Sequence, residues 1–112
     1  MRALKAGGTS SKHPVIAVIT DGEEAGLLGA NAFLQNAALK ARVGAVVNVE
    51  ARGTRGQSLL FLTSPGDGRL IDLYAAHVPV MATSSLYAEI YKFLPNDTDL
   101  TLFIRAGFPS FN

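Results

Sequence analysis

The chain alternates short apolar runs with segments in which apolar residues recur at helical spacing. Residues 15–19, VIAVI, form a continuous apolar run, which predicts a strand buried on both faces of a parallel sheet. Residues 25–39 have the spacing of a helix with one buried face, and residues 43–49, VGAVVNV, are a second run of strand length. A strand, a helix and a strand in this order predict a right-handed crossover with the two strands parallel.

The pattern after residue 50 predicts further strands and helices. Strands are expected at 58–63 and 108–112, and helices at 69–77, 84–93 and 98–106, with Asp97 as the cap of the last helix and Gly107 at its end. Residues 2–6 have the character of a helix end, stopped by Gly7 and Gly8. This order of elements predicts an α/β fold with a mostly parallel sheet and helices on its faces.

Glycines and carboxylates meet where the first predicted strand passes into its helix. Gly26 and Gly29 disfavour a helix interior, so they indicate either close backbone packing, an awkward strand-to-helix turn or simple fraying. Glu23 and Glu24 precede them, and Glu50 follows the second predicted strand. If both strands are parallel, the three carboxylates share one rim of the sheet, where ligands bind in open α/β folds.

Carboxylates that share a rim repel one another unless a cation lies among them or protons are taken up. Because the chain has no cysteine, only oxygen and imidazole ligands remain, which suit zinc or manganese when a histidine takes part. The alternative is a solvated acidic turn that caps the following helix. His13 precedes a proline in a polar loop, where a solvated role is expected.

Composition excludes several classes of protein. The chain has 112 residues, 48% apolar and 17% charged, which predicts one folded domain with a real core. Its formal net charge of +1 has no basic patch behind it, so nucleic acid is not an expected partner. No apolar run approaches the ~20 residues of a membrane span. The first residues lack the apolar region of a signal peptide.

Three segments of the chain carry a resemblance to a known family. DGEEAGLLGA, then NVEARG, and LPNDTDLTLF near the end resemble the co-catalytic zinc aminopeptidase family. This family includes bacterial leucyl aminopeptidases, glutamate carboxypeptidases and the vacuolar or endoplasmic reticulum membrane metallopeptidases. The membrane branch is the nearer match, because it too has Glu in the NxE segment. The resemblance extends from about residue 15 to residue 112 and implies a three-layer α/β/α domain.

The resemblance implies a role for each carboxylate. Glu23 looks like the general base that takes a proton from metal-bound water, and Glu24 and Glu50 look like ligands of the two zinc ions. Asp97 and Asp99 fall in the segment that lines the rim, and they are expected to shape that loop and support the site. The implied activity is hydrolysis of a peptide substrate by an exopeptidase of aminopeptidase type.

The chain also departs from the family pattern. The family has a His-x-Asp segment and a bridging Asp before the position of residue 15, and a last His after the position of residue 112. His13 and His77 do not match these positions. We therefore expect a truncated peptidase-like domain over residues 1–112, incomplete at both ends, inactive alone and weak in zinc binding. Its open sheet edges predict a homo-oligomer, and the resemblance implies a membrane-associated or extracytoplasmic parent.

Two other classes of function stay open on the sequence. Glutaminyl cyclases and receptor ectodomains use a similar scaffold, and some have lost metal ligands, although the presence of both Glu23 and Glu24 favours hydrolysis. The chain could also be a binding or assembly module whose carboxylates only cap helices. Tyr87 and Tyr91 fit either a substrate pocket or a hydrophobic core.

Overall fold

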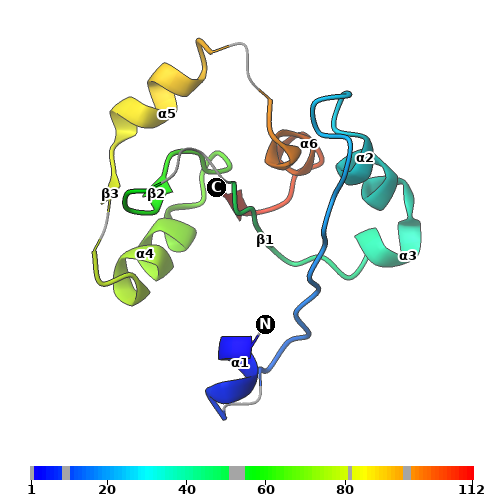
Figure 1. Cartoon of the computed structure of the whole chain (residues 1–112), viewed down its shortest axis with the longest axis horizontal. Helices are drawn as coiled ribbons and strands as arrows, with labels where there is room; N and C mark the ends of the chain where they lie inside the picture. Colours follow the sequence, from blue (N-terminus) through cyan, green and yellow to red (C-terminus); the bar gives the residue numbers. More distant parts are fainter. Residues whose placement is uncertain (1, 9–10, 51–54, 81, 95–96) are drawn as a thin grey trace.

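The computed structural model describes residues 2–8, 11–50, 55–80, 82–94 and 97–112 of the chain. Within these residues lie helices α1 to α6 and strands β1 to β4 (Figure 1). In chain order they are α1 (Arg2–Ala6), α2 (Leu28–Gln35), α3 (Ala37–Lys40), β1 (Val46–Val47), β2 (Leu59–Leu60), α4 (Gly68–His77), β3 (Ala82–Thr83), α5 (Ser85–Tyr91), α6 (Asp99–Arg105) and β4 (Ser110–Phe111).

The described strands form two small parallel pairs. β1 pairs with β4, with Val46 opposite Ser110, and β2 pairs with β3, with Leu59 opposite Ala82. A single antiparallel bridge between Thr63 and Phe111 joins the two pairs. Mixed helices and parallel strand pairs agree with the α/β class expected from the sequence.

The hydrophobic core lies where α2 packs against α6. The buried apolar side chains at this interface are Leu27, Ala30, Leu100 and Phe103, and a further buried one, Leu60, lies in β2. The ring of Phe103 contacts those of Phe33 and Phe108, with centroid separations of 5.8 and 6.3 Å. This cluster fixes α6 against α2 and against the approach to β4, and so holds together segments of the chain that carry candidate site residues.

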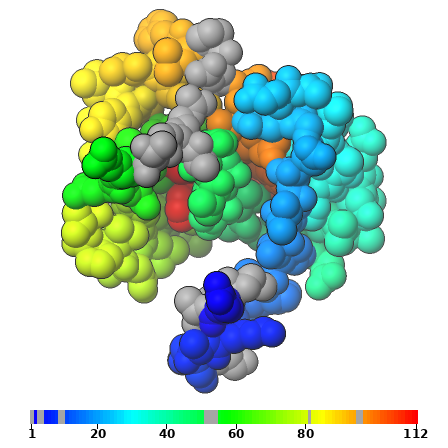
Figure 2. Space-filling view, viewed as in Figure 1, coloured from blue at the N-terminus to red at the C-terminus, as the bar shows by residue number. Residues whose placement is uncertain are grey.

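The expected strand at residues 15–19 is wrong. These residues have extended backbone with no strand partner, and Val15, Val18 and Ile19 are 54, 44 and 98% exposed. Figure 2 shows this part of the chain, in blue, running along the outside of the molecule towards α1, which projects from it. An apolar run becomes a buried strand only where neighbouring strands offer their edges, and among the described residues none is bonded to this run.

The expected helix at residues 25–39 is too long. Leu27 and Gly26 have φ values of 59° and 104°, so the helix begins only at Leu28. It is interrupted at Asn36, whose extended backbone ends α2 and whose Oδ1 accepts a hydrogen bond from the Leu39 amide at 3.1 Å, starting α3. Asparagine favours this capping position, which the apolar spacing alone did not reveal.

The other predicted helices and strands are found at the expected positions, but they differ in length from the prediction. Helices α4, α5 and α6 confirm the three helices expected after residue 68. The predicted strands are shorter than expected, and β3 was not predicted. Asp97 is not the cap of α6, because Thr98 occupies the N-cap position and its amide donates to Thr101 Oγ1 at 3.3 Å. Asp97 instead pairs with Arg105, at 3.6 Å from Nη2.

Candidate functional site

Glu23 and Glu24 lie in a tight turn between the extended segment and α2. The Glu23 carbonyl accepts hydrogen bonds from the amides of Gly26 and Leu27, at 3.0 and 2.9 Å. The Leu28 amide reaches back to the Gly22 carbonyl at 3.1 Å, and Gly22 has a φ of 70°, which favours glycine. Glu23 is half-buried and Glu24 is exposed, so the two neighbouring carboxylates have different surroundings.

Gly29 lets the chain pass close to this turn. Its amide donates to the Asp21 carbonyl at 3.0 Å. A Cβ at this position would lie 2.8 Å from the Asp21 amide nitrogen and 2.9 Å from Thr20 Cβ. Close backbone packing, one of the meanings considered for the two glycines, is therefore confirmed for Gly29. The segment before Glu23 rests directly on the first turn of α2.

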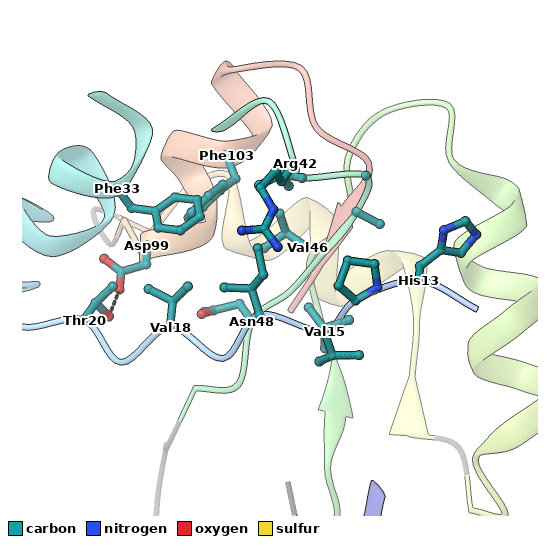
Figure 3. A pocket seen from close by; sticks show the side chains of 16 residues that line it. His13, Val15, Val18, Thr20, Phe33, Arg42, Val46, Asn48, Asp99 and Phe103 are labelled. Atoms are coloured by element: carbon teal, nitrogen blue, oxygen red, sulfur yellow. Dashed lines mark hydrogen bonds between the residues drawn. The ribbon is translucent and has the colours of Figure 1, made fainter. Parts of the chain in front are cut away.

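Thr20 and Asp99 join the two halves of the candidate site. The Thr20 hydroxyl donates a hydrogen bond to Asp99 Oδ2, although the two residues are 79 positions apart (Figure 3). The other carboxylate oxygen, Oδ1, is buried and has no hydrogen-bond partner among the described residues. The structure thus brings the segment that carries Glu23 and Glu24 to the start of the helix that carries Asp99.

The Thr20–Asp99 pair lies at a cavity of about 640 Å³. One wall is the extended segment, including Val15 and Val18, and the other includes Val46 and Asn48 from β1 and its continuation. Figure 3 shows Phe33 and Phe103 close to Asp99, while Arg42 and His13 lie farther along the cavity. Most of the lining is apolar, so Asp99 is one of its few charged groups.

A polar network holds the end of the chain against α6. The Asn48 side-chain nitrogen donates to Asn112 Oδ1 at 3.0 Å, and the Asn112 side-chain nitrogen donates to Thr98 Oγ1 at 3.3 Å. Asn112 and Thr98 are buried. Because Asn48 lies two residues before Glu50, the network also fixes the direction in which the chain leaves β1 towards that carboxylate.

Glu50 lies at a second cavity, of about 440 Å³. Its walls include Leu59 and Phe61 from the β2 region and Tyr87, Ile90, Tyr91 and Leu94 from α5 and the turn after it. The Phe61 and Tyr91 rings are in contact, with centroids 5.1 Å apart. Tyr87 and Tyr91 therefore line a pocket beside a predicted site residue. Tyr87 is 42% exposed, which does not suit a closed core.

The candidate metal ligands in the described part of the chain do not form a metal site by themselves. Among the described residues, no three His, Asp or Glu side chains lie close enough together to hold one. The expected convergence of Glu23, Glu24 and Glu50 as a group is therefore not found in the described part of the chain. His13 is exposed, and His77 Nδ1 lies 2.8 Å from the Leu73 carbonyl at the end of α4, as suits a histidine with a local structural role.

Sequence reasoning missed Thr20, Asn48 and Asn112 as parts of the site's framework. Thr20 is the first polar residue after the apolar run, and this position was a signal that it could meet another element. The partners of the two asparagines could not be read from the sequence, because they depend on how β1 lies against β4.

No described helix is long and apolar enough to cross a membrane.

Comparisons with known proteins identify the family of the chain. The model of peptidase family M28 matches residues 1–112. Human endoplasmic reticulum metallopeptidase 1 is 26% identical over 109 residues, covering 96% of this chain and 12% of that protein. The vacuolar membrane protease of Lachancea thermotolerans is 33% identical over 92 residues, or 80% of this chain and 9% of the protease. The chain spans about a tenth of the length of such relatives. No solved structure matches it significantly.

Proposed function

The chain belongs to peptidase family M28, and on this premise we propose that it is part of the catalytic domain of a zinc-dependent exopeptidase of aminopeptidase type. The observation that carries the proposal is the hydrogen bond from Thr20 to Asp99. It joins the turn with Glu23 and Glu24 to the segment with Asp97 and Asp99, which are the two parts of the chain that the proposed site needs side by side.

The proposed roles follow the chemistry of each side chain. Glu23, in the half-buried turn, is the general base for peptide hydrolysis, and Glu24 and Glu50 are metal ligands. Asp99 supports the turn through Thr20, and Asp97, paired with Arg105, holds the approach to α6. Zinc would supply the activated water in the complete site. The described donors do not form a metal site by themselves, and we propose that further ligands of the parent complete it.

The proposed parent is a larger protein with a three-layer α/β/α peptidase domain. In it β1 and β4 pair as they do here, and the extended segment belongs to the same mostly parallel sheet. The relatives bear the names of endoplasmic reticulum and vacuolar membrane proteins, which supports a parent in the secretory pathway or associated with a membrane. The 112-residue chain alone is proposed to be inactive, because its described residues do not form a metal site.

Substitutions in the complete parent test the proposed roles. We expect Glu23→Gln to lower kcat by roughly 10²–10⁴-fold with the zinc content unchanged, as for loss of a general base. Glu24→Ala and Glu50→Ala should lower the zinc content itself, measured by elemental analysis. Glu89→Gln is the matched control, because Glu89 is exposed on α5 and pairs only with Lys92 in a described ion pair. Full activity of Glu23→Gln would overturn the proposal.

Calorimetry on the isolated chain tests its predicted inactivity. We expect no zinc binding at micromolar concentrations and no hydrolysis of aminoacyl anilides, since structural and catalytic zinc sites normally use three or four protein ligands. Tight zinc binding that disappears in Glu24→Ala and Glu50→Ala, with turnover abolished by Glu23→Ala, would show instead that this chain holds a complete site.

A further inference from the structure

The cavity of about 440 Å³ at Glu50 has one wall made by a single helical face. Tyr87, Ile90, Tyr91 and Leu94 line it, and their spacing of i, i+3, i+4 and i+7 is that of an apolar stripe along a helix. Such a stripe normally packs against a core, but Tyr87, Ile90 and Leu94 remain 42, 49 and 46% exposed. The stripe therefore faces a hollow within the described part of the chain.

The opposite wall of the cavity comes from β2 and the residue after it. Leu59 and Phe61 line the cavity, whereas Leu60 between them is buried and does not, as expected for alternate residues of an extended chain. The Phe61 ring contacts the Tyr91 ring of the helical wall, with centroids 5.1 Å apart. This aromatic contact joins the two walls, and apolar groups surround the space that they leave.

Local hydrogen bonds hold the two walls in place. The Thr83 hydroxyl donates to the Leu60 carbonyl at 2.9 Å, and so ties β3 to β2 beyond their strand pairing. Ser84 follows β3 directly, and its side chain caps α5 by accepting from the Leu86 amide at 3.2 Å. The start of α5 is thus fixed relative to β2. A cavity formed in this way costs little ordering when a ligand enters it.

The chemistry of the walls selects among possible ligands. Glu50 is the charged side chain among the described residues that line the cavity, and Gln57 and Ser58 are neutral. A second carboxylate would be repelled by Glu50, and a basic side chain would lose water to walls that offer it few acceptors. The volume lies within the range of about 300–1,000 Å³ typical of sites for small ligands. The cavity therefore suits a large apolar side chain.

We propose that the Glu50 cavity binds the side chain of the N-terminal residue of the peptide substrate and selects large apolar residues, of the size of leucine or phenylalanine. This inference rests on the proposed function, in which Glu50 is a site residue. A side chain beside Glu50 then belongs to a residue next to the scissile bond. The side chain of the N-terminal residue is one bond closer to the scissile carbonyl carbon than that of the following residue. The N-terminal side chain is thus the one that this cavity receives.

Hydrolysis of aminoacyl anilides by the complete parent tests the preference. We expect kcat/KM for phenylalanyl and leucyl anilides to exceed that for glutamyl and lysyl anilides by at least about tenfold, the scale on which apolar pockets discriminate. Preference for the glutamyl or lysyl substrate would overturn the proposal.

Variants of Tyr87 test whether this cavity is the source of the preference. Tyr87→Ala removes much of one wall and should lower the ratio of kcat/KM for phenylalanyl to alanyl anilide by about tenfold. Tyr87→Phe should restore the ratio, because the ring and not the hydroxyl forms the wall. Leu86→Ala is the matched control, since Leu86 is an exposed apolar residue of α5 that does not line the cavity. Equal ratios in Tyr87→Ala and Leu86→Ala would overturn the proposal.

Photolabelling separates this inference from the proposed function, because it needs no turnover. Irradiation of the complete parent with p-benzoylphenylalaninamide should label peptides that carry residues 56–61 or 85–94. Excess phenylalaninamide should suppress the labelling, and glutamic acid amide should not. Labelling of these segments without hydrolysis of any anilide would overturn the proposed function and leave the cavity as a site for apolar residues. Hydrolysis with labelling confined to other segments would overturn the role of the cavity alone.

Discussion

The Thr20 hydroxyl donates a hydrogen bond to Asp99 Oδ2 and so joins the beginning of the candidate site to its end. Thr20 is the last residue before the acidic turn, and Asp99 is the first residue of α6. Holding two positions so far apart in sequence together costs conformational entropy of the chain between them. The bond therefore organises the site only if other contacts offset this cost. The packing of α2 on α6 beside it provides that support.

Replacing Thr20 by Val should destabilise the chain by about 2 kcal/mol, because a hydrogen bond to a charged group is lost with little change in shape. The loss is made larger because Asp99 Oδ1 is already buried without a described partner. Without the Thr20 hydroxyl, Oδ2 loses its hydrogen bond as well. Urea denaturation measures the change. The double variant with Asp99→Ala should cost less than the sum of the two single variants, since each single variant removes the same bond. Simple additivity would show that the bond contributes nothing to stability.

Gly29→Ala should be far more damaging than an ordinary glycine substitution. The added methyl would lie 2.8–2.9 Å from the backbone atoms of Asp21, which cannot move without breaking the acidic turn. We expect a loss of about 1–3 kcal/mol, the usual range for overpacking. Gly44→Ala is the matched control, because a Cβ added at Gly44 would have no other atom within 4 Å. Equal stability of the two variants would contradict the close approach at Gly29.

The sequence predicted elements well where local signals determine them. α4, α5 and α6 have clear apolar spacing within one helix, and their positions needed no knowledge of the rest of the fold. The acidic turn was considered as one of two alternatives, because carboxylates and glycines interrupt an apolar run there. Similar local signals identified Glu23, Glu24 and Glu50 as candidates. Asp97 and Asp99 were identified only through the family resemblance, on which all the proposed roles rest.

Predictions that depended on distant partners were less successful. Residues 15–19 have every local property of a buried strand, but a strand needs neighbours, and their presence is not a property of the run itself. The hydrogen bond that Thr20 makes and the network of Asn48 with Asn112 likewise depend on packing between segments far apart in the chain. The predicted cap of α6 was wrong by one residue for a different reason, because the local capping bond between Thr98 and Thr101 was overlooked.

Phe103 should be the most sensitive aromatic residue of the described core. It is only 7% exposed and contacts the rings of Phe33 and Phe108. Phe103→Ala should cost about 3–5 kcal/mol, a large share of the stability of a chain of this size. Phe93→Ala is its control, since Phe93 is 86% exposed and should change stability by less than about 0.5 kcal/mol. Thermal denaturation followed by circular dichroism compares them, and similar midpoints would place the core elsewhere.

Leu27 combines a buried side chain with a left-handed backbone, and the two requirements can be separated by substitution. It is 7% exposed, and its φ of 59° precedes the first residue of α2. Leu27→Ala should cost about 2–5 kcal/mol through lost burial, and it keeps the strained backbone. Leu27→Gly loses slightly more apolar surface but removes a left-handed penalty of about 1–2 kcal/mol.

The glycine variant should therefore be as stable as the alanine variant or more stable by about 1 kcal/mol, the reverse of the order in a helix interior. Ala30→Gly provides the comparison, because Ala30 is buried within α2 and should lose about 1 kcal/mol or more. Denaturant midpoints of the three variants measure both effects. If Leu27→Gly is instead less stable than Leu27→Ala by about 1 kcal/mol, as in a helix interior, the turn does not impose a left-handed conformation at Leu27. The carboxylates before it would then be held by side-chain packing alone.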